Sequence, residues 1–375
     1  MTEATTTSSK DAELPKIIKK KHSDRIWEID FLRGLCILLV IMDHLFFNFT
    51  VFDNFARGLA TNFNEVHSPF FDAMIDFAFI YRRHTIQTAV RFAVVFVFIL
   101  VSGVSCAFSK NNGKRILKLL MGSLVITLMT IAVFLFNNIT PSTPQQPGVP
   151  LSEYTNFIII SVVSIILLIG ITYMLIKRIC NNNLFFLAST LVVVGLLILV
   201  VFFGTRHPIA PLHNEGAILP GNNDIILFSI LMIVALSVLV YLLAKRLWDN
   251  KWFFLGLGIV IMVLSFTFGG FSYIDRVPAL REWSFLNVLE SLAGTRMFGG
   301  DWYGILPWTG MFLIGAFFGR VLYADRKTCL PVLVGKWHVP ISFCGRKTLL
   351  VYVIHQPAII LVMAIIALIA GYRFW

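Results

Sequence analysis

Two histidines and an arginine stand in stretches that are otherwise apolar, and they are the first candidates for chemistry. Arg33 and His44 lie eleven residues apart in the apolar run 31–52, and His355 lies in the run 348–370. On an α-helix this spacing is about 20° beyond three full turns, so Arg33 and His44 share one face about 16 Å apart. An imidazole titrates near neutral pH and can take a proton from an attacking group. A guanidinium can pair with phosphate oxygens.

Other polar residues accompany this face of the first apolar run. Asp30 precedes Arg33 by three residues and can pair with it, and Asn48 follows His44 by four residues on the same stripe. Asp43 points about 100° away from His44, so it is either an orienting group or a structural partner of another helix. Ionisable residues in apolar spans are costly and by default mark function. The plainer alternative is that each histidine only hydrogen-bonds a neighbouring helix and that Arg33 anchors a lipid headgroup.

A second set of candidates lies toward the opposite end of the apolar runs. Arg91 begins the run 89–108, where it either serves the site or reaches the membrane surface along its apolar stem. Asp301 and Trp302 precede the run 304–323, which contains Trp308. An acid beside aromatic rings suits stacking against a sugar, although Tyr and Trp at such positions also form the ordinary interfacial belt. These residues are therefore candidates for substrate binding.

The elements that must position these residues are membrane helices. The chain has 375 residues, of which 57% are hydrophobic and only 14% charged. Soluble proteins contain about 25% charged residues, so an ordinary soluble globule is excluded. A bilayer-spanning helix needs about 20 mostly apolar residues. The sequence predicts an all-α, polytopic transmembrane helical bundle with about nine spans: 31–52, 89–108, 116–136, 157–176, 184–203, 225–244, 252–271, 304–323 and 348–370.

The basic residues predict the orientation of this bundle. With nine spans, all 14 lysines and eight arginines fall on one side, and the other side holds nine arginines and no lysine. The positive-inside rule places the lysine-rich side in the cytoplasm. We therefore expect a multi-pass plasma-membrane protein with its N-terminus inside and its C-terminus outside. The net charge of +11 is then explained by contact with membrane lipid, and a nucleic-acid partner has no support.

The chain reads as one membrane domain, 25–375, preceded by a basic, disordered cytoplasmic tail, 1–24. The stretch 69–83 has a good helix start at Ser68–Pro69 but is too short to span, so it predicts an interfacial or re-entrant helix. If it did span, every later sidedness assignment would invert. The five cysteines show no CxxC or Cys/His spacing typical of zinc, and no metal is expected.

Three segments resemble the heparan-alpha-glucosaminide N-acetyltransferase catalytic-domain family, within the transmembrane acyltransferase superfamily. They are RIWEIDFLRGL at Arg25–Leu35 followed by His44, DWYGILPWTGMFLIG at Asp301–Gly315, and SFCGRKTLLVYVIHQP at Ser342–Pro357. The spacing from Arg33 to His44 is also that of the wider superfamily. The sequence departs from the family pattern at Gly304, where a proline is usual, and around 151–156, where a histidine-containing pattern is missing.

The resemblance implies acyl transfer from cytoplasmic acetyl-CoA or another acyl-CoA to a hydroxyl or amine of an outer-face glycan or glycolipid. On the residues themselves, Arg33, with which Asp30 can pair, can bind the phosphates of CoA and is helped by Lys114, Arg115 and Arg346 near the inner mouth. The pantetheine arm would follow the first helix to His44, the general base, through one continuous cleft. His355 or Asn48 would orient His44 or steady the developing oxyanion.

Two other functions stay open on the residues alone. Intramembrane Asp and His side chains also relay protons, so a proton-coupled transporter is the main alternative, although no inverted repeat is visible. A non-catalytic membrane scaffold is the third possibility, in which Arg33 and His44 could be replaced without consequence.

Overall fold

The computed structural model describes most of the chain outside its N-terminal tail and several connecting segments. The described residues are 26–59, 69–109, 111–139, 159, 162–163, 165–170, 172–174, 229–268, 277–278, 285–294, 296–297 and 304–369. The described part contains ten α-helices: α1 (Trp27–Leu59), α2 (Pro69–Arg83), α3 (Thr85–Ala107), α4 (Asn112–Ile139), α7 (Ile230–Leu247), α8 (Lys251–Thr267), α9 (Phe285–Ala293), α10 (Ile305–Leu322), α11 (Val339–Arg346) and α12 (Thr348–Ile369). A parallel pair of two-residue strands, β1 (Val277–Pro278) and β2 (Arg296–Met297), is the exception to the all-α prediction.

The long helices coincide with the predicted spans. Within the described residues, α3, α7, α10 and α12 are long and apolar enough to cross a membrane. The helices α1, α4 and α8 occupy three further predicted runs. The run 157–176 is described only in fragments, and 184–203 lies outside the described residues. A membrane helical bundle is therefore confirmed, while the number of nine spans and the orientation of the termini stay predictions.

The helix α2 begins at Pro69, where the sequence predicts a helix start, and its 15 residues end at Arg83. Proline is favoured in the first turn because its missing N–H would have no partner there. Fifteen residues extend about 22 Å, less than the roughly 30 Å of a hydrocarbon core. The predicted helix is thus present, and its interfacial or re-entrant placement stays a prediction.

The centre of the bundle is α10, which packs against α3, α7 and α8. Its buried face includes Phe312, Leu313 and Ala316, none of which is accessible to solvent. Close approach to α3 depends on small residues, because a Cβ at Gly315 would overlap the backbone of Leu100. Small residues commonly let membrane helices pack this closely.

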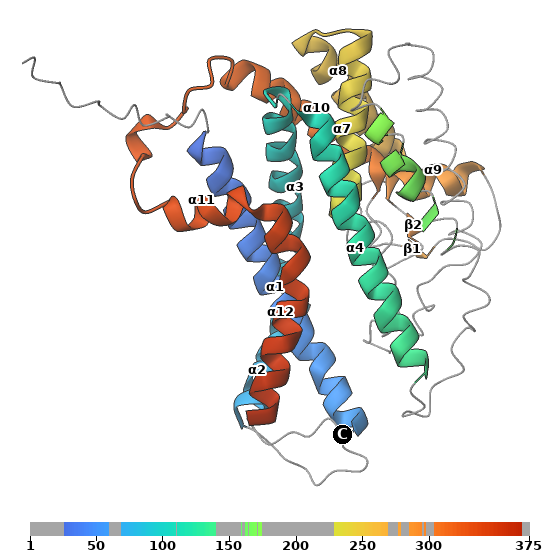
Figure 1. The fold of residues 1–375 in the computed structure, drawn as a ribbon, viewed down its shortest axis with the longest axis vertical. Coiled ribbons are helices and arrows are strands. Elements are labelled where there is room, and N and C mark those ends of the chain that lie inside the picture. The colour runs from blue at the N-terminus through green and yellow to red at the C-terminus, as the bar shows by residue number, and fades with distance from the viewer. Residues whose placement is uncertain are drawn as a thin grey trace, which may run out of the picture.

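The first helix packs against the last two, far apart in sequence (Figure 1). The α1–α11 contact again requires glycines: a Cβ at Gly34 would overlap the backbone of Ile341, and one at Gly345 would overlap that of Asp30. Since α12 follows α11 directly, this contact fixes where α12 runs along α1. An apolar cluster with Phe49 of α1 and Ile359 of α12 continues the contact.

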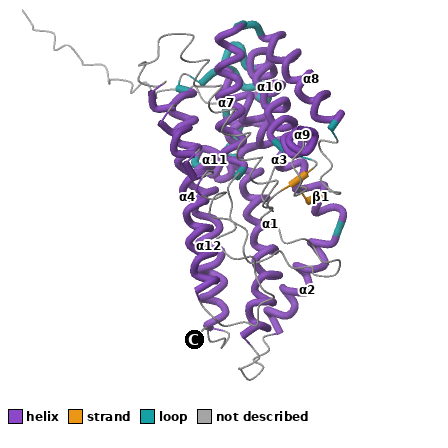
Figure 2. Tube along the Cα trace, turned by 90° about the vertical axis from the view of Figure 1, so that its right-hand side faces the viewer, coloured by secondary structure: helices purple, strands orange, loops and turns teal. Residues whose placement is uncertain are grey.

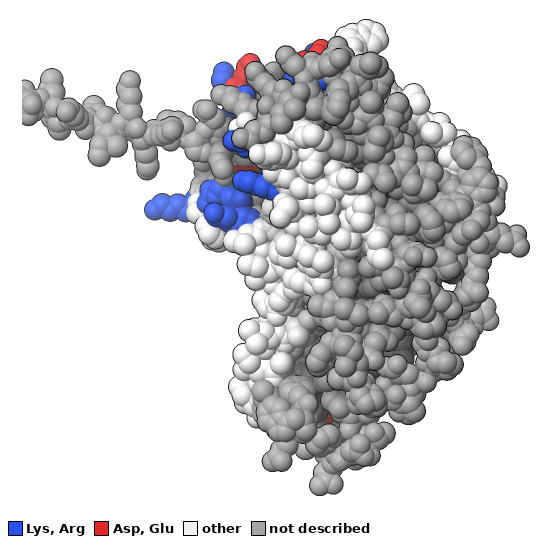
Figure 3. Space-filling model, turned by 45° about the vertical axis from the view of Figure 1, so that its right-hand side comes forward, with Lys and Arg blue, Asp and Glu red and all other residues white. Residues whose placement is uncertain are grey.

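The long helices run roughly along the long axis of the molecule (Figure 2). On the face that Figure 3 shows, the Lys and Arg side chains of the described residues gather toward one end, and the described residues just below them are drawn white, without charged side chains. At the N-terminal end of α1 the buried Glu28 carboxylate accepts hydrogen bonds from the Thr328 hydroxyl at 2.9 Å and the Cys329 backbone N–H at 2.6 Å. This carboxylate ties α1 to the segment after α10.

Candidate functional site

The two histidines singled out in the sequence meet at the α1–α12 contact. The ring of His44 lies 4.9 Å from the ring of His355 between centroids, with the planes tilted by 55°. His44 is half-buried and His355 is buried. The charges and titratable groups that act on His44 are His355, Asp43 and Arg91. His44 therefore faces a neighbouring helix that carries a second imidazole.

Main-chain and amide groups hold both histidines. The Asn48 side-chain amide donates to the backbone carbonyl of His44 at 2.7 Å, and the Gln356 amide donates to Asn48 Oδ1 at 3.2 Å. His355 Nδ1 lies 2.6 Å from the backbone carbonyl oxygen of Tyr352, one turn earlier in α12. Two acceptor atoms nearby, His355 Nε2 and Gln356 Oε1, are buried without a hydrogen-bond partner among the described residues.

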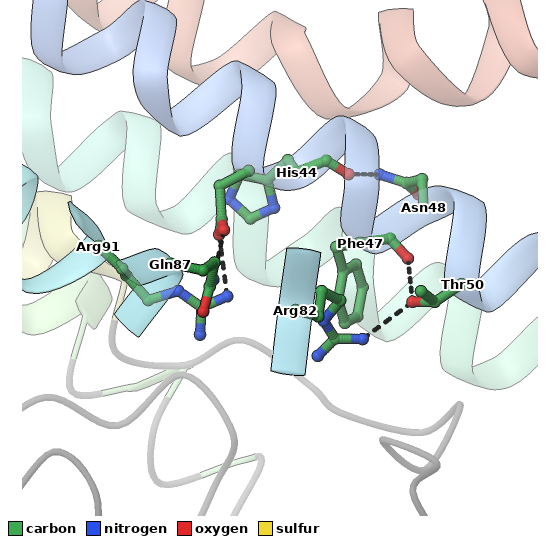
Figure 4. A network of polar contacts seen from close by, with 8 residues as sticks. His44, Phe47, Asn48, Thr50, Arg82, Gln87 and Arg91 are labelled. Carbon is green, nitrogen blue, oxygen red and sulfur yellow. Dashed lines mark hydrogen bonds and ion pairs between the residues drawn. The ribbon is translucent and has the colours of Figure 1, made fainter. Parts of the chain in front are cut away.

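Asp43 faces α3 instead of His44, as the 100° offset predicts. Its Oδ1 accepts from the Gln87 amide at 2.6 Å, and its Oδ2 pairs with the Arg91 guanidinium at 2.9 Å. Figure 4 shows Gln87 and Arg91 reaching toward α1 beside His44. Gln87 and Arg91 are one helical turn apart, so both side chains project from the same face of α3. Asp43 thus joins α1 to α3 and carries its charge next to the histidine pair.

A second guanidinium comes from the end of α2. Arg82 donates to the Thr50 hydroxyl at 2.9 Å and lies 4.9 Å over the ring of Phe47 (Figure 4). Burial lowers the pKa of Arg82, and the charge of Arg91 lowers it further. Burial raises the pKa of the Tyr81 phenol, and the negative charge of Asp43 adds to this rise. The ends of α2 and α3 therefore place Tyr81 and Arg82 in the electrostatic field of the Asp43–Arg91 pair.

Arg33 lies at a separate point, between α1, α3 and α4. Its Nη2 donates to the hydroxyl of Ser105, and Arg115 Nη1 lies 3.5 Å from the same oxygen and 3.3 Å from the backbone carbonyl of Ser102. Ser105 in turn donates within its own helix, at 3.0 Å to the backbone carbonyls of Val101 and Ser102. Two guanidinium groups thus converge on one hydroxyl, and their role in binding CoA stays a prediction.

The other predicted site residues are dispersed. Arg346 is exposed and lies 5.8 Å from the Phe343 ring, and the backbone of Asp30 packs against Gly345. Trp308 is 2% exposed and its ring lies 5.8 Å from that of Phe92, so its described contacts are those of a packing residue. Asp301 and Trp302 lie outside the described residues. Their roles in binding stay predictions, as does the continuous cleft.

Sequence reasoning missed several residues that the structure brings to these sites, among them Gln87, Ser105 and Gln356 and, at the end of α2, Tyr81 and Arg82. Gln87 could have been found because it precedes Arg91 by four residues and is polar within an apolar run. Gln356 directly follows His355, and an amide beside a titratable imidazole gives no separate signal of a site. Ser105 gave no signal, because a serine in a membrane helix usually bonds only its own backbone.

Part of the chain is similar to a known protein family. No curated protein and no solved structure matches the chain. Residues 216–357 match the family model described as heparan-alpha-glucosaminide N-acetyltransferase, catalytic. This stretch contains two of the three segments that carry the resemblance, including the one with His355. Residues 216–357 of the chain are therefore similar to the heparan-alpha-glucosaminide N-acetyltransferase catalytic-domain family.

Proposed function

We propose that this protein is a membrane-embedded acyltransferase. It moves an acetyl or other acyl group from cytoplasmic acyl-CoA to a hydroxyl or amine of an extracytoplasmic glycan or glycolipid at the plasma membrane. The family match supports acetyl transfer, because the matched model is that of an N-acetyltransferase catalytic region. The same match favours a transferase over a transporter.

The observation that carries the proposal is the packing of His44 against His355, at a centroid separation of 4.9 Å. Acyl transfer to a hydroxyl or amine requires a base that removes a proton as the nucleophile attacks the thioester carbon. A neutral imidazole at the junction of two membrane helices is suited to that task, and a site closed to bulk water limits competing hydrolysis. His44 is the base in this proposal.

The donor would bind where Arg33 and Arg115 converge on Ser105. Two guanidinium groups offer several N–H donors to phosphate oxygens, in a fixed planar geometry that lysine lacks. Arg33 lies about 16 Å from His44 along α1, a distance that the extended arm of CoA can bridge. Arg346 and Asp30 are placed at the same end of α1 and would assist nucleotide binding.

The acceptor would approach from the opposite end of the site. Asp43, Arg91 and Asn48 surround His44 there and supply carboxylate, guanidinium and amide groups for a polar acceptor. Asp301, Trp302 and Trp308 precede or begin α10 and are proposed to complete the acceptor site. Asp43 would also bias the charge at His44, since it lies close enough to act on that imidazole.

The test is acetyl transfer by membrane vesicles that contain the wild type, His44→Ala or His338→Ala, supplied with acetyl-CoA labelled in its acetyl group. We expect His44→Ala to lose a factor of about 10²–10⁴ in rate, the usual contribution of a general base. His338→Ala is a matched control, because His338 is 9% exposed, like His355, and its ring stacks on Trp27 at 4.4 Å. Equal rates for His44→Ala and the wild type would remove His44 from the mechanism.

A further inference from the structure

We infer that His355 is a second proton acceptor, whose Nε2 receives the proton that His44 withdraws from the acyl acceptor. This inference rests on the proposed function and gives the His44–His355 contact a direction of proton transfer. The sequence left two roles open for His355, orienting His44 or stabilising the oxyanion. The geometry around its two ring nitrogens decides against the second of these.

The tautomer of His355 follows from its contact with the Tyr352 carbonyl. A carbonyl oxygen can only accept a hydrogen bond, and it lies 2.6 Å from His355 Nδ1. Nδ1 must therefore carry the hydrogen. In the neutral imidazole the other nitrogen then bears a lone pair and no hydrogen. Neutral His355 thus presents an acceptor at Nε2 and cannot donate a hydrogen bond from that atom to an oxyanion.

The same Nε2 is a buried acceptor that has no partner among the described residues. His355 is 9% exposed, so its Nε2 is largely withdrawn from bulk solvent. A buried polar atom without a partner is costly and needs an explanation, and a catalytic role is one of the recognised reasons. A proton that binds Nε2 would use the lone pair of this atom. The resulting positive charge would be spread over the ring, whose Nδ1–H already donates to the Tyr352 carbonyl oxygen.

The neighbouring donor of such a proton is His44, whose ring centroid is 4.9 Å away. Rings at this separation can pass a proton directly or through one water after small reorientations. As the acceptor O–H or N–H bond breaks, its proton binds one nitrogen of His44, and the hydrogen on the other nitrogen of His44 moves to His355 Nε2. The acceptor atom bonds the acyl carbon and the carbon–sulfur bond breaks. The CoA thiolate then takes the proton back from His355 through His44, and both imidazoles return to their neutral forms.

The amide contacts position the two helices for this exchange. Gln356 of α12 donates to Asn48, which donates to the His44 carbonyl of α1. Gln356 and Asn48 are positioning residues here, because they touch neither ring nitrogen of the pair. The charged groups that face the pair from α1 and α3 are Asp43 and Arg91.

A spectroscopic test addresses the tautomer without requiring activity. Nitrogen NMR of protein with labelled histidines in detergent micelles, with the His355 signals assigned by their loss in His355→Gln, reports which ring nitrogen is protonated. We expect protonated Nδ1 and unprotonated Nε2 for His355. Protonation at Nε2 with a bare Nδ1 would overturn the inference, whatever the activity of the preparation.

A kinetic test addresses the proton transfer. His355→Gln retains an acceptor oxygen and similar bulk but cannot take a proton, so we expect kcat to fall by about 10²–10⁴ with acetyl-CoA binding unchanged. Added imidazole should restore part of the rate of His355→Ala and should leave unchanged the rate of His338→Ala, in which the buried histidine outside the site is replaced. A wild-type rate in His355→Gln would overturn the inference. A loss of rate that imidazole does not rescue, and that weaker acetyl-CoA binding or a smaller amount of folded protein explains, would also overturn it.

The two proposals fail in different ways. If wild-type vesicles transfer no acetyl group, the proposed function fails, while the tautomer measured by NMR still decides the state of His355. If His44→Ala is inactive and His355→Gln is fully active, the proposed function stands and only the relay is wrong.

Discussion

At the scale of single residues, the site depends on polar groups whose partners come from other helices. Asp43 meets Gln87 and Arg91 of α3, and the Asp43 side chain is 18% exposed. A carboxylate so placed in an apolar bundle is tolerable only while its charge is paired and hydrogen-bonded. The pair therefore links the position of α3 to the segment of α1 that carries His44.

Removing one partner of this pair should destabilise the protein more than removing both. Arg91→Ala removes the cation that pairs with the Asp43 carboxylate and keeps the hydrogen bond from Gln87. We expect a loss of about 2 kcal/mol, below the 3–5 typical of fully buried pairs, because Arg91 is 35% exposed. Thermal unfolding in detergent measures it. The double variant Asp43→Asn with Arg91→Ala should recover part of the loss. Additive effects of the two substitutions would show that the pair is not coupled.

At the scale of elements, the position of α12 along α1 is set by the short helix α11, which packs against α1 and directly precedes α12. Gly345 of α11 faces the backbone of Asp30 so closely that any side chain would overlap it. A side chain there would push α11 away from α1 and shift α12 with it. The separation of the two histidine rings therefore depends on a glycine ten residues before His355.

Gly345→Ala should accordingly destabilise the protein by about 1–3 kcal/mol, the usual cost of overpacking, and should also reduce activity. The matched control is Gly256→Ala in α8, where a Cβ would meet nothing within 4 Å. That substitution should be neutral or stabilise by up to about 1 kcal/mol, because alanine favours helix more than glycine does. Melting temperatures in detergent compare the two, and similar values would mean that the α1–α11 contact tolerates a wider spacing.

At the scale of the whole molecule, the predicted orientation assigns each end of the bundle to one compartment. All lysines lie on the side predicted to be cytoplasmic, where Cys329 follows α10 and is exposed. The exposed Ile80 of α2 belongs to the end predicted to face outward. Donor and acceptor must approach from these opposite ends if the proposed reaction crosses the membrane.

A membrane-impermeant maleimide should therefore label Cys329 in inside-out vesicles and not in right-side-out vesicles. Cys329→Ser serves as the blank, in a background in which Cys180→Ser and Cys344→Ser remove the other two thiols predicted to lie on the same side. In that background Ile80→Cys should show the opposite pattern. Labelling of both positions from one side would overturn the nine-span arrangement.

Composition and spacing determined the class of protein, the helices and the polar residues worth examining. They sufficed because the bilayer requires about 20 apolar residues and internal hydrogen bonds in each span, conditions that can be read locally. The offset between Asp43 and His44 followed from helix geometry for the same reason. The contact of His44 with His355 and the meeting of Arg33 with Arg115 at Ser105 arose only in the tertiary structure. They depend on which helix faces pack together, and that choice is made by backbone contacts at glycines hundreds of residues apart, which no local pattern records.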